Sequence, residues 1–372
     1  MQIPIFRGGG CVKKVKLGEI CEIVTGSTPK SSNPNYWNGE YKWITPAEIS
    51  DDDFIVFDTQ RKITKLGIEE TGLKSFPTGT VLLSSRAPIG KVAIAGCEMY
   101  CNQGFKNFIC SNKINNEYLY YFFKSRKNYL NILGRGATFK EISKSLVSDI
   151  EILLPTYDIQ RKQVKVLKKI DKLIYTRKEQ FIEFEYLVKS RFNEIFGDPL
   201  NNDKMFAVKT GQQCFKFSSG KLLDKNDRVF EGYPAYGGNG IAWKSRNYLI
   251  DNPTIIIGRV GAYCGNVRTS HGKAWISDNA IYIKEFKNLD FNLVFLLELI
   301  KVIDFSRFAD FSGQPKITQK PLEKQKYIVP PLDLQNEFAD FVAQVDKSQL
   351  AIQKSLDELE TLKKSLMQEY FG

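Results

Sequence analysis

The feature that most constrains the fold of this chain is an internal repeat. Residues 155–197 recur as residues 330–372, at a constant offset of 175 positions and without a gap. Thirteen of the 43 aligned positions are identical, including the first and the last. Self-similarity of this kind indicates that a whole structural unit is duplicated. We therefore expect the chain to alternate globule, long helix, globule, long helix, with two similar modules held at a fixed separation.

Apolar residues recur within each repeat at alternating spacings of three and four, which predicts an amphipathic helix with one narrow apolar seam. Asp158 and Asp333 each follow an opening proline by three residues and suit helix N-capping, and Gly197 followed by Pro199 predicts the end of the first helix. About 38 residues at about 1.5 Å per residue would form a rod of roughly 55–60 Å, the scale of one to two turns of DNA. The predicted helix-helix seam comprises Leu167, Ile170, Ile174, Phe181, Phe184, Val188, Ile195, Val342, Val345, Ile352, Leu356, Leu359 and Leu366.

An apolar seam this long must be buried, and packing against the other copy of the repeat is the simplest way to bury it. Because a whole globule separates the copies, and because equivalent repeats pair most simply about a pseudo-two-fold axis, we expect an antiparallel pair. The alternative is that each helix packs onto its own globule or onto another protein.

The segments outside the repeats have a different pattern. They contain short apolar runs such as Val92–Ala95 and Thr254–Gly258, separated by Gly, Asn and Pro, which predict β-strands. Helical patterns occur late in each segment, around Asn116–Leu133 and Phe291–Phe305. Weak similarity between the two segments joins residues 83–91 to 257–266, 101–104 to 277–280, and 136–142 to 313–317.

Together these patterns predict an α+β fold with two similar mixed α/β domains and two long helices that form an antiparallel, pseudo-two-fold symmetric coiled coil. The predicted segments are a first domain at residues 11–154, a central helix at 155–197, a second domain at 205–329 and a C-terminal helix at 330–372.

The charge of the chain is concentrated in the two globular segments. The formal net charge is +11, from 53 basic and 42 acidic residues. Residues 156–197 hold ten basic and six acidic side chains, residues 331–372 hold four and eight, and their charges of +4 and −4 cancel. The excess therefore lies in the globules, as expected if these bind a polyanion such as nucleic acid. Mild basicity alone is also common among soluble bacterial proteins.

The sequence contains no convincing catalytic set. Asn33–Tyr36 lacks the second proline of an adenine methyltransferase motif, and Asp278 with Glu285 and Lys287 is a degenerate nuclease pattern. The single histidine, His271, lies in a predicted turn, and Gly237–Gly240 lacks the Lys-Ser/Thr of a phosphate loop. The seven cysteines form no C-x-x-C pair, which favours reduced thiols over a disulfide framework or a metal site. With no long apolar run and no signal peptide, we expect a soluble, cytoplasmic protein without membrane association.

Basic and amide side chains cluster near the predicted turns of both globules. Arginine can read guanine, asparagine and glutamine can read adenine, and lysine suits phosphate. The recurrence of these residue types in both copies predicts a DNA-binding surface in each. The predicted DNA-binding residues are Arg86, Lys91, Asn102, Gln103, Lys106, Arg135, Thr138, Lys140 and Lys144 in the first globule, and Arg259, Asn266, Arg268, Asn279, Gln314, Lys316 and Lys320 in the second.

The order of motifs along the chain resembles the specificity subunits of type I restriction-modification systems. The resemblance rests on Val15–Gly26 with Tyr41–Ile49 in the first module, on Tyr233–Gly240 in the second, and on the proline-to-glutamine segments Pro155–Gln160 and Pro330–Gln335 that lead into the helices. It covers essentially the whole chain. One departure is the short, Gly-rich leader Met1–Cys11, which leaves any N-terminal helix of the family reduced or missing.

The resemblance implies that two target-recognition domains each read one half of a split site in double-stranded DNA. We predict that they bind successive grooves about one turn apart. The helices would set the spacing and dock two modification subunits, and restriction subunits that act as translocases would complete the assembly. This chain would then be non-catalytic and hold no cofactor. Adenine-N6 methylation and ATP-driven cleavage, with S-adenosylmethionine, ATP and Mg²⁺, would belong to partner chains.

Two other functions remain open on the residues alone. The chain could be a coiled-coil adaptor whose globules bind proteins, or a self-sufficient DNA methyltransferase or nuclease. DNA binding at two salt concentrations distinguishes the adaptor. Cofactor uptake or metal-dependent nicking by the isolated chain distinguishes the enzyme.

Overall fold

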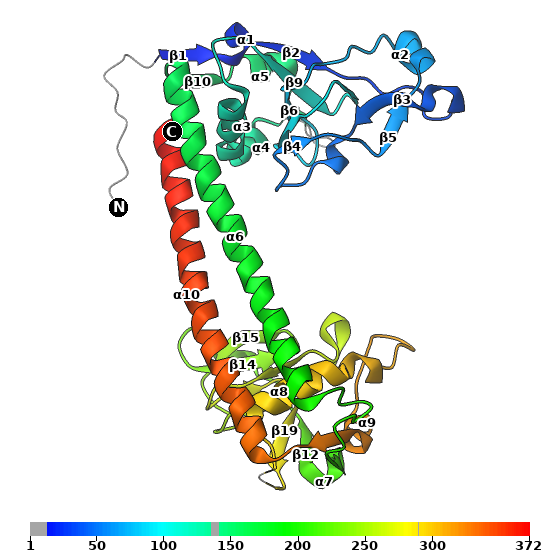
Figure 1. Cartoon of the computed structure of the whole chain (residues 1–372), viewed down its shortest axis with the longest axis vertical. Coiled ribbons are helices and arrows are strands. Elements are labelled where there is room, and N and C mark those ends of the chain that lie inside the picture. The colour runs from blue at the N-terminus through cyan, green and yellow to red at the C-terminus, as the bar shows by residue number, and fades with distance from the viewer. Residues whose placement is uncertain (1–12, 135–140, 289) are drawn as a thin grey trace. The chain divides into compact units, whose positions relative to one another are not determined.

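The computed structural model describes residues 13–134, 141–288 and 290–372. The chain divides into two compact units. Unit 1 contains residues up to Arg177 together with Ser355–Gly372, and unit 2 is Lys178–Lys354. Each unit contains one predicted globule and part of each long helix (Figure 1). Within the described part of the chain, no helix is both long enough and apolar enough to cross a membrane.

Unit 1 contains a five-stranded sheet of order β2-β9-β6-β7-β4, a three-stranded sheet of order β5-β3-β8 and the strand pair β1-β10. Helix α3 packs on the larger sheet, and the main core lies between them. The elements are β1 (Lys13–Lys16), α1 (Leu17–Ile20), β2 (Cys21–Thr25), η1 (Pro34–Tyr36), β3 (Trp37–Ile44), η2 (Pro46–Glu48), β4 (Ile55–Val56), β5 (Arg61–Ile63), α2 (Lys65–Thr71), β6 (Val81–Ser84), β7 (Val92–Ala95), β8 (Tyr100–Cys101), β9 (Phe105–Cys110), α3 (Asn116–Ser125), α4 (Lys127–Leu133), α5 (Lys144–Ser148) and β10 (Glu151–Leu154).

Unit 2 contains two four-stranded sheets, of order β12-β19-β16-β17 and β13-β15-β14-β18, and the strand pair β11-β20. Its core lies around helix α8. The elements are β11 (Ala207–Thr210), α7 (Gly211–Cys214), β12 (Phe215–Ser219), η3 (Lys225–Asp227), β13 (Arg228–Val229), β14 (Tyr233–Gly237), β15 (Gly240–Ser245), β16 (Ile255–Gly258), η4 (Gly261–Tyr263), β17 (Val267–Thr269), β18 (Trp275–Ile276), β19 (Ala280–Phe286), α8 (Leu293–Ile303), η5 (Phe305–Phe308), α9 (Gln319–Lys324) and β20 (Lys326–Val329).

The two units share one topology, which confirms the prediction of two similar mixed α/β domains. In each, the first strand pairs antiparallel with the last, as β1 with β10 and β11 with β20. In each, a central strand lies between two antiparallel neighbours, β6 between β9 and β7, and β16 between β19 and β17. In each, the second sheet contains one parallel pair, β3 with β8 and β14 with β18.

These strand registers correct one detail of the predicted correspondence. Cys101 pairs with Ile44 in the parallel pair of unit 1, and Ile276 pairs with Tyr236 at the same place in unit 2. Cys101 is therefore equivalent to Ile276, whereas the sequence similarity had matched Cys101 to Ser277, one residue later. The alignment had matched side-chain types, whereas hydrogen-bond register fixes the equivalence.

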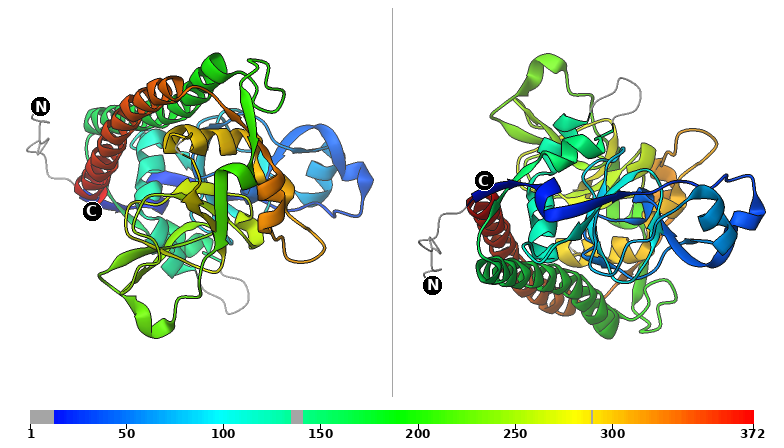
Figure 2. Two further views of the ribbon diagram at one scale, coloured as in Figure 1. Left: turned by 90° about the horizontal axis from the view of Figure 1, so that it is seen from below. Right: turned by 90° about the horizontal axis from the view of Figure 1, so that it is seen from above.

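The repeats form the helices α6 (Tyr157–Phe196) and α10 (Leu332–Phe371), which lie side by side within each unit (Figures 1 and 2). In unit 1 the Asp171 carboxylate lies 2.5 Å from the Lys363 ammonium, and in unit 2 the Arg191 guanidinium lies 2.7 Å from the Glu337 carboxylate. The beginning of α6 thus meets the end of α10, and the end of α6 meets the beginning of α10. The helices are antiparallel, as predicted.

Burial along the helices follows the three-and-four spacing. None of the thirteen predicted seam residues is exposed. Between residues 172 and 190 of α6, every residue outside a narrow stripe is exposed. The stripe comprises Ile174, Arg177, Gln180, Phe181, Phe184 and Val188.

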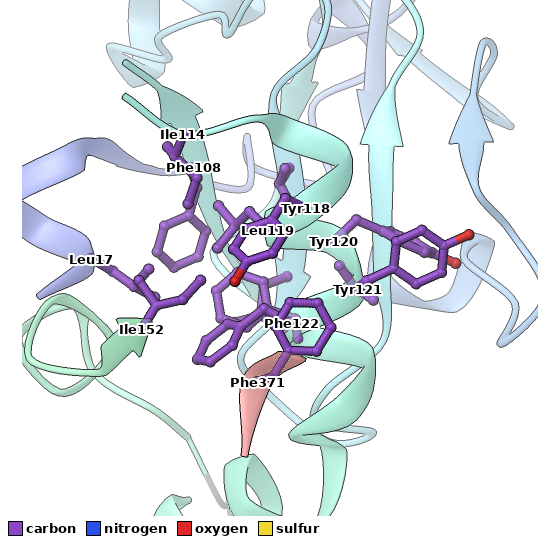
Figure 3. Close-up of a cluster of buried hydrophobic side chains, with 14 of the residues drawn as sticks. Leu17, Phe108, Ile114, Tyr118, Leu119, Tyr120, Tyr121, Phe122, Ile152 and Phe371 are labelled. Atoms are coloured by element: carbon purple, nitrogen blue, oxygen red, sulfur yellow. The ribbon is translucent and has the colours of Figure 1, made fainter. Parts of the chain in front are cut away.

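The ends of the helices also pack into the globules. The beginning of each helix packs onto its own globule, as Leu167 and Val342 do, which realises the alternative in part, and the C-terminal end packs onto the other globule. In unit 1 the ring of Phe371, at the end of α10, lies 5.0 Å from that of Tyr118 in α3 and faces it and Phe122 (Figure 3). In unit 2 the equivalent Phe196, at the end of α6, lies 4.6 Å from Phe295 in α8. The last aromatic residue of each repeat therefore anchors its helix in a hydrophobic core.

The glutamine at the sixth position of each repeat ties its helix to the neighbouring globule. The buried Gln160 accepts a hydrogen bond of 2.8 Å from the Asn115 backbone N–H, and its amide donates to the carbonyls of Lys113 and Pro155 at 3.0 and 2.9 Å. Gln335 makes the same three bonds, from Asn292 at 2.8 Å and to Asp290 and Pro330 at 2.9 Å each. Asn115 and Asn292 are the N-caps of α3 and α8, so each glutamine fixes its helix against the start of a core helix.

Replacing Gln335 by Leu should lower the free energy of unfolding by about 3–5 kcal/mol. The substitution leaves the Asn292 N–H and the Asp290 carbonyl, both part-buried, and the buried Pro330 carbonyl without this partner, and each group left unsatisfied away from water costs about 1–3 kcal/mol. The midpoint of urea unfolding of the full chain measures the loss. Gln344→Leu, an exposed position of the same helix, is the matched control and should change stability by less than about 0.5 kcal/mol. Equal losses in both variants would contradict the role given to Gln335.

Candidate nucleic-acid interface

Four loops of unit 2 converge at one end of its sheets. The two-residue turn Gly238–Asn239 joins β14 to β15, and a Cβ on Gly238 would lie 3.5 Å from the Asn279 carbonyl and 3.8 Å from the Tyr263 Cβ. The Arg259 N–H donates to the Asn279 carbonyl at 2.9 Å. The turn after β14, the segment after β16 and the segment before β19 therefore lie together.

The fourth loop, residues 310–316, closes this cluster. Its base is a backbone pair, in which the Asp310 N–H donates to the Lys316 carbonyl at 2.9 Å and the Lys316 N–H donates back at 3.1 Å. The Gly261 N–H donates to the Pro315 carbonyl, also at 2.9 Å, and φ at Gly261 is +75°. The loop is thus fastened to the segment after β16 by main-chain hydrogen bonds that do not depend on side chains.

Arg268 reaches the cluster from β17 because residue 240 has no side chain. A Cβ at Gly240 would lie only 2.4 Å from Nη1 of Arg268, and φ at Gly240 is +110°. A larger residue would be strained at that φ and would displace the guanidinium. The glycine-rich segment 237–240 is therefore a β-hairpin turn that leaves room for an arginine.

The structure brings most of the predicted DNA-binding residues of unit 2 to these loops. Arg259 and Arg268 are half-buried, and Nη1 of Arg259 donates to the Asp278 carbonyl at 3.3 Å. Lys320 is exposed in the first turn of α9, just after the fourth loop. The remaining predicted residues, exposed on the loops themselves, are Asn266, Asn279, Gln314 and Lys316.

Unit 1 builds the same loop cluster with different side chains. The Ser85 N–H donates to the Gly104 carbonyl at 2.7 Å, and the Ile142 N–H donates to the Ser85 carbonyl at 2.9 Å. In unit 2 the equivalent bonds run from the Arg259 N–H to the Asn279 carbonyl and from the Ile317 N–H to the Arg259 carbonyl. Lys91 donates to the Pro46 carbonyl at 3.1 Å, which joins the turn after β3 to the cluster.

Polar side chains occupy the loops of unit 1 in three ways. Asn102 is half-buried, and its side chain accepts from the Gly104 N–H at 2.9 Å. Gln103 is exposed and accepts a hydrogen bond from the Thr28 hydroxyl. Lys144 is exposed in the first turn of α5. Three further predicted residues, Arg135, Thr138 and Lys140, lie outside the described residues.

Lys106 does not fit its predicted place as a surface contact. It is 5% exposed, and its ammonium donates to the Ser85 hydroxyl at 3.1 Å and lies 3.2 Å from the Glu141 carboxylate. The exposed Arg86 binds the same carboxylate at 3.0 Å. Lys106 lies on a central strand of the sheet, which a local sequence pattern does not distinguish from a neighbouring loop. We assign it a positioning role, in which it holds Glu141 and through it Arg86.

The two cations lower the pKa of the Glu141 carboxyl. Burial alone would raise the pKa of Glu141, but hydrogen bonds from Lys106 and Arg86 outweigh burial, and the pKa lies below its usual value. Because the folded-state pKa is depressed, this contribution to stability is present at neutral pH and is lost as the pH falls below the ordinary carboxyl range. The equivalent residue in unit 2 is Lys316, so the two clusters differ in charge at one matched position.

The residues considered for catalysis do not converge. Asp278 precedes β19, while Glu285 lies near the other end of that strand and Lys287 follows it. The Lys287 ammonium donates to the Gln212 carbonyl at 2.6 Å. Asn33–Tyr36 contains a 3₁₀ turn, in which the Asn33 side chain accepts from the Asn35 N–H. In the ranges that the structure describes, no three His, Cys, Asp or Glu side chains are grouped to hold a metal ion.

Sequence reasoning missed two aromatic residues in the unit 2 cluster. Tyr263 is 46% exposed in the segment after β16, and Phe311 is 72% exposed in the fourth loop. Neither residue lies in a periodic hydrophobic pattern, so the local sequence does not distinguish them from aromatic residues that are buried in the core. Their exposure becomes visible only when the loops are folded.

Comparisons with known proteins agree with this architecture. The model of the type I restriction modification DNA specificity domain matches residues 11–183 and 204–362. The chain is 36% identical over 240 residues to the type I restriction enzyme MjaIX specificity subunit of Methanocaldococcus jannaschii, which covers 59% of this chain but only 55% of that subunit. It is 22% identical over 378 residues to the EcoprrI specificity subunit of Escherichia coli, covering 95% of this chain and 91% of that subunit.

Solved structures show the same fold. The S subunit of a type I restriction-modification system from M. genitalium superposes with a TM-score of 0.62 at 17% identity, covering 99% of this chain and 98% of that one. A chain from a structure of type I restriction-modification complex assembly and conformational transition superposes with a TM-score of 0.59, also at 17% identity, covering 96% of this chain and 97% of that one. With two matched domains, the shared fold and the duplicated loop clusters, this chain belongs to the family of type I restriction-modification DNA specificity subunits.

Proposed function

We propose that this chain selects the DNA site of a type I restriction-modification complex, with unit 1 reading one half of a bipartite sequence and unit 2 the other. The observation that carries the proposal is the duplicated loop cluster. Each unit presents arginine, amide and lysine side chains on loops that main-chain hydrogen bonds hold in equivalent positions. Two equivalent clusters with different side chains suit two half-sites of different sequence.

The chemistry of the clusters suits duplex DNA. Arginine can form bidentate bonds to guanine, and asparagine and glutamine can bond to adenine. Exposed lysines such as Lys316 and Lys320 suit phosphates, and phosphate binding makes affinity depend on salt. The net charge of +11, with no excess on the two helices taken together, adds attraction for a polyanion at the globules.

Within this proposal, the long helices set the distance between half-sites and dock two modification subunits, and restriction subunits join the full complex. The chain itself is non-catalytic and holds no cofactor. Adenine methylation with S-adenosylmethionine, and cleavage with ATP and Mg²⁺, are assigned to the partner chains. The proposal is supported by the family membership and by the scattered positions of Asp278, Glu285 and Lys287.

The proposal predicts different effects for Lys316→Ala and Arg259→Ala in a complex reconstituted with modification subunits. Lys316→Ala should weaken binding to all duplexes and lower the slope of log affinity against log salt by about 1. Arg259→Ala should relax sequence preference at one position, by about 1–3 kcal/mol. Filter binding with duplexes that carry the methylated site, at several salt concentrations, measures both effects.

Lys216→Ala is the matched control for these variants. Lys216 is exposed in the same unit and pairs with Glu285, near the end of β19 opposite the loops. This variant should keep the wild-type salt slope and sequence preference. Equal slopes for Lys316→Ala and the wild type, with unchanged preference in Arg259→Ala, would show that this surface does not bind DNA.

A further inference from the structure

The fourth loop of unit 2 exposes an aromatic ring that belongs to neither hydrophobic cluster described in that unit. Phe311 is 72% exposed, although it lies in a short loop closed by the two backbone hydrogen bonds between Asp310 and Lys316. The Ser312 N–H donates to the Asp310 carboxylate at 2.9 Å, which further fixes the residues around the ring. Holding a phenylalanine in water on an ordered loop gives up the stabilisation that its burial would provide.

The surroundings of Phe311 disfavour a protein-docking surface. The next three residues, Ser312, Gly313 and Gln314, are all exposed, and none is apolar. A protein interface generally has a contiguous apolar patch, whereas small and polar residues follow Phe311 in its loop, and the other exposed aromatic residue of the cluster, Tyr263, carries a polar hydroxyl. Lys316 and Gln314 on the same loop offer donors suited to phosphate and base edges.

A phenylalanine ring offers no hydrogen bond to a phosphate or to a base edge. Its favourable contacts with DNA are apolar and stacking contacts, and side chains of this kind can insert between base pairs, where they partly unstack one step and kink the duplex. A loop closed by main-chain hydrogen bonds suits this use, because its backbone then needs less ordering on binding.

We propose that Phe311 is a wedge that inserts at one base step of the half-site read by unit 2, while Gln314 and Lys316 hold the flanking base edge and phosphate. This inference rests on the proposed function and adds to it a deformation of the DNA. Phe311 then selects sequence indirectly, because steps differ in how readily they unstack. It is a positioning residue and takes no part in chemistry.

The test uses the chain in complex with modification subunits and a duplex that carries the site found by methylation mapping. The fluorescent base 2-aminopurine replaces one base at a time along both halves of the site, and its fluorescence rises when the base unstacks. Protein is added to saturation, and the anisotropy of an end label on the same duplex confirms binding. The target adenines are left unsubstituted, because methyltransferases extrude their target base from the stack, and the wild type should give a rise of several-fold at one or two other, neighbouring positions within one half-site.

Phe311→Ala should remove most of that rise, and Phe311→Leu, which keeps an apolar side chain, should retain part of it. Phe230→Ala is the matched control. Phe230 is 100% exposed in the same unit, at the turn before β14. Gly232, two residues after Phe230, lies beside the last residue of β15, because a Cβ on Gly232 would lie 2.5 Å from the Ser245 carbonyl. The length of β15 puts Ser245 about 17 Å from Gly240, which lies in the loop cluster. This control should leave the rise unchanged.

The possible failures are distinguishable. If the wild type binds its site no better than a scrambled duplex, the proposed function is wrong. If it discriminates between the two but shows no rise, or if Phe311→Ala keeps the full rise, the wedge is wrong and site selection stands. If Phe311→Ala does not bind at saturation, Phe311→Leu decides, because a reduced rise at the wild-type positions in a bound Phe311→Leu complex supports the wedge and a full wild-type rise overturns it.

Discussion

Removal of four residues from each long helix is expected to shorten the spacer between the two halves of the recognised site by one or two base pairs. Residues 178–181 of α6 and the equivalent residues 353–356 of α10 are suitable, because the repeat relates them by the offset of 175. Four residues shorten a helix by about 6 Å, and base pairs are stacked about 3.4 Å apart. Four is also a spacing of the seam, so the apolar stripes should still meet after a rotation of about 40°.

Methylation mapping of DNA modified by the deletion variant measures the new spacer. The unshortened site should lose nearly all of its methylation, because the two half-sites would no longer be in register with both units. A control variant with Lys178, Glu179, Gln353 and Lys354 replaced by alanine keeps the length and should keep the site, since all four are exposed. An unchanged spacer in a deletion variant that still methylates would show that the helices do not set the distance.

Exchange of residues 11–154 for the equivalent segment of another family member is expected to replace one half of the site and leave the other intact. Both strands of the β1-β10 pair move with the segment, so the exchanged domain keeps its closing pair. Gln160 bonds the backbone of Asn115 and Lys113, so its contacts do not depend on the exchanged side chains. A donor with an aromatic residue at the position of Tyr118 preserves the contact with Phe371.

The size of this effect follows from base discrimination. Each mismatched base pair costs about 1–3 kcal/mol, and the costs at separate positions roughly add. A half-site of several base pairs should therefore change completely. Exchange of residues 205–329 is the reciprocal control and should change the other half. If either exchange altered both halves, the units would not read independently.

The long-range architecture was predictable because its signals lie in the chain itself. The repeat and its three-and-four spacing predicted α6 and α10, and none of the thirteen seam residues is exposed. Strand signals predicted β7 at Val92–Ala95 to the residue. The C-terminal stop of α6 was also a local signal, since Gly197 has the positive φ, +67°, of a helix C-terminal glycine. The N-capping expected of Asp158 and Asp333 was wrong, because the helices begin one residue earlier and both carboxylates lie in the first turn.

The details of the loop clusters were not predictable, because they depend on residues far apart in the sequence. The pairing of Glu141 with both Arg86 and Lys106 joins residues 55 and 35 positions apart. The hydrogen-bond partners of Gln335 are backbone atoms, and every residue type offers these, so the sequence contains no signal for them. The exposure of Phe311 follows from closure of its loop by Asp310 and Lys316. Sequence patterns located the clusters, and long-range hydrogen bonds decided which side chains face solvent.

The most direct test of site selection by this chain is methylation mapping of unmodified DNA after incubation with modification subunits and S-adenosylmethionine, with and without this polypeptide. With it, a single bipartite sequence should be methylated, and the reaction without it should leave that sequence unmodified. If the modification subunits alone methylated the same sequence, they would contain the specificity themselves, and the role proposed for the two loop clusters would be contradicted.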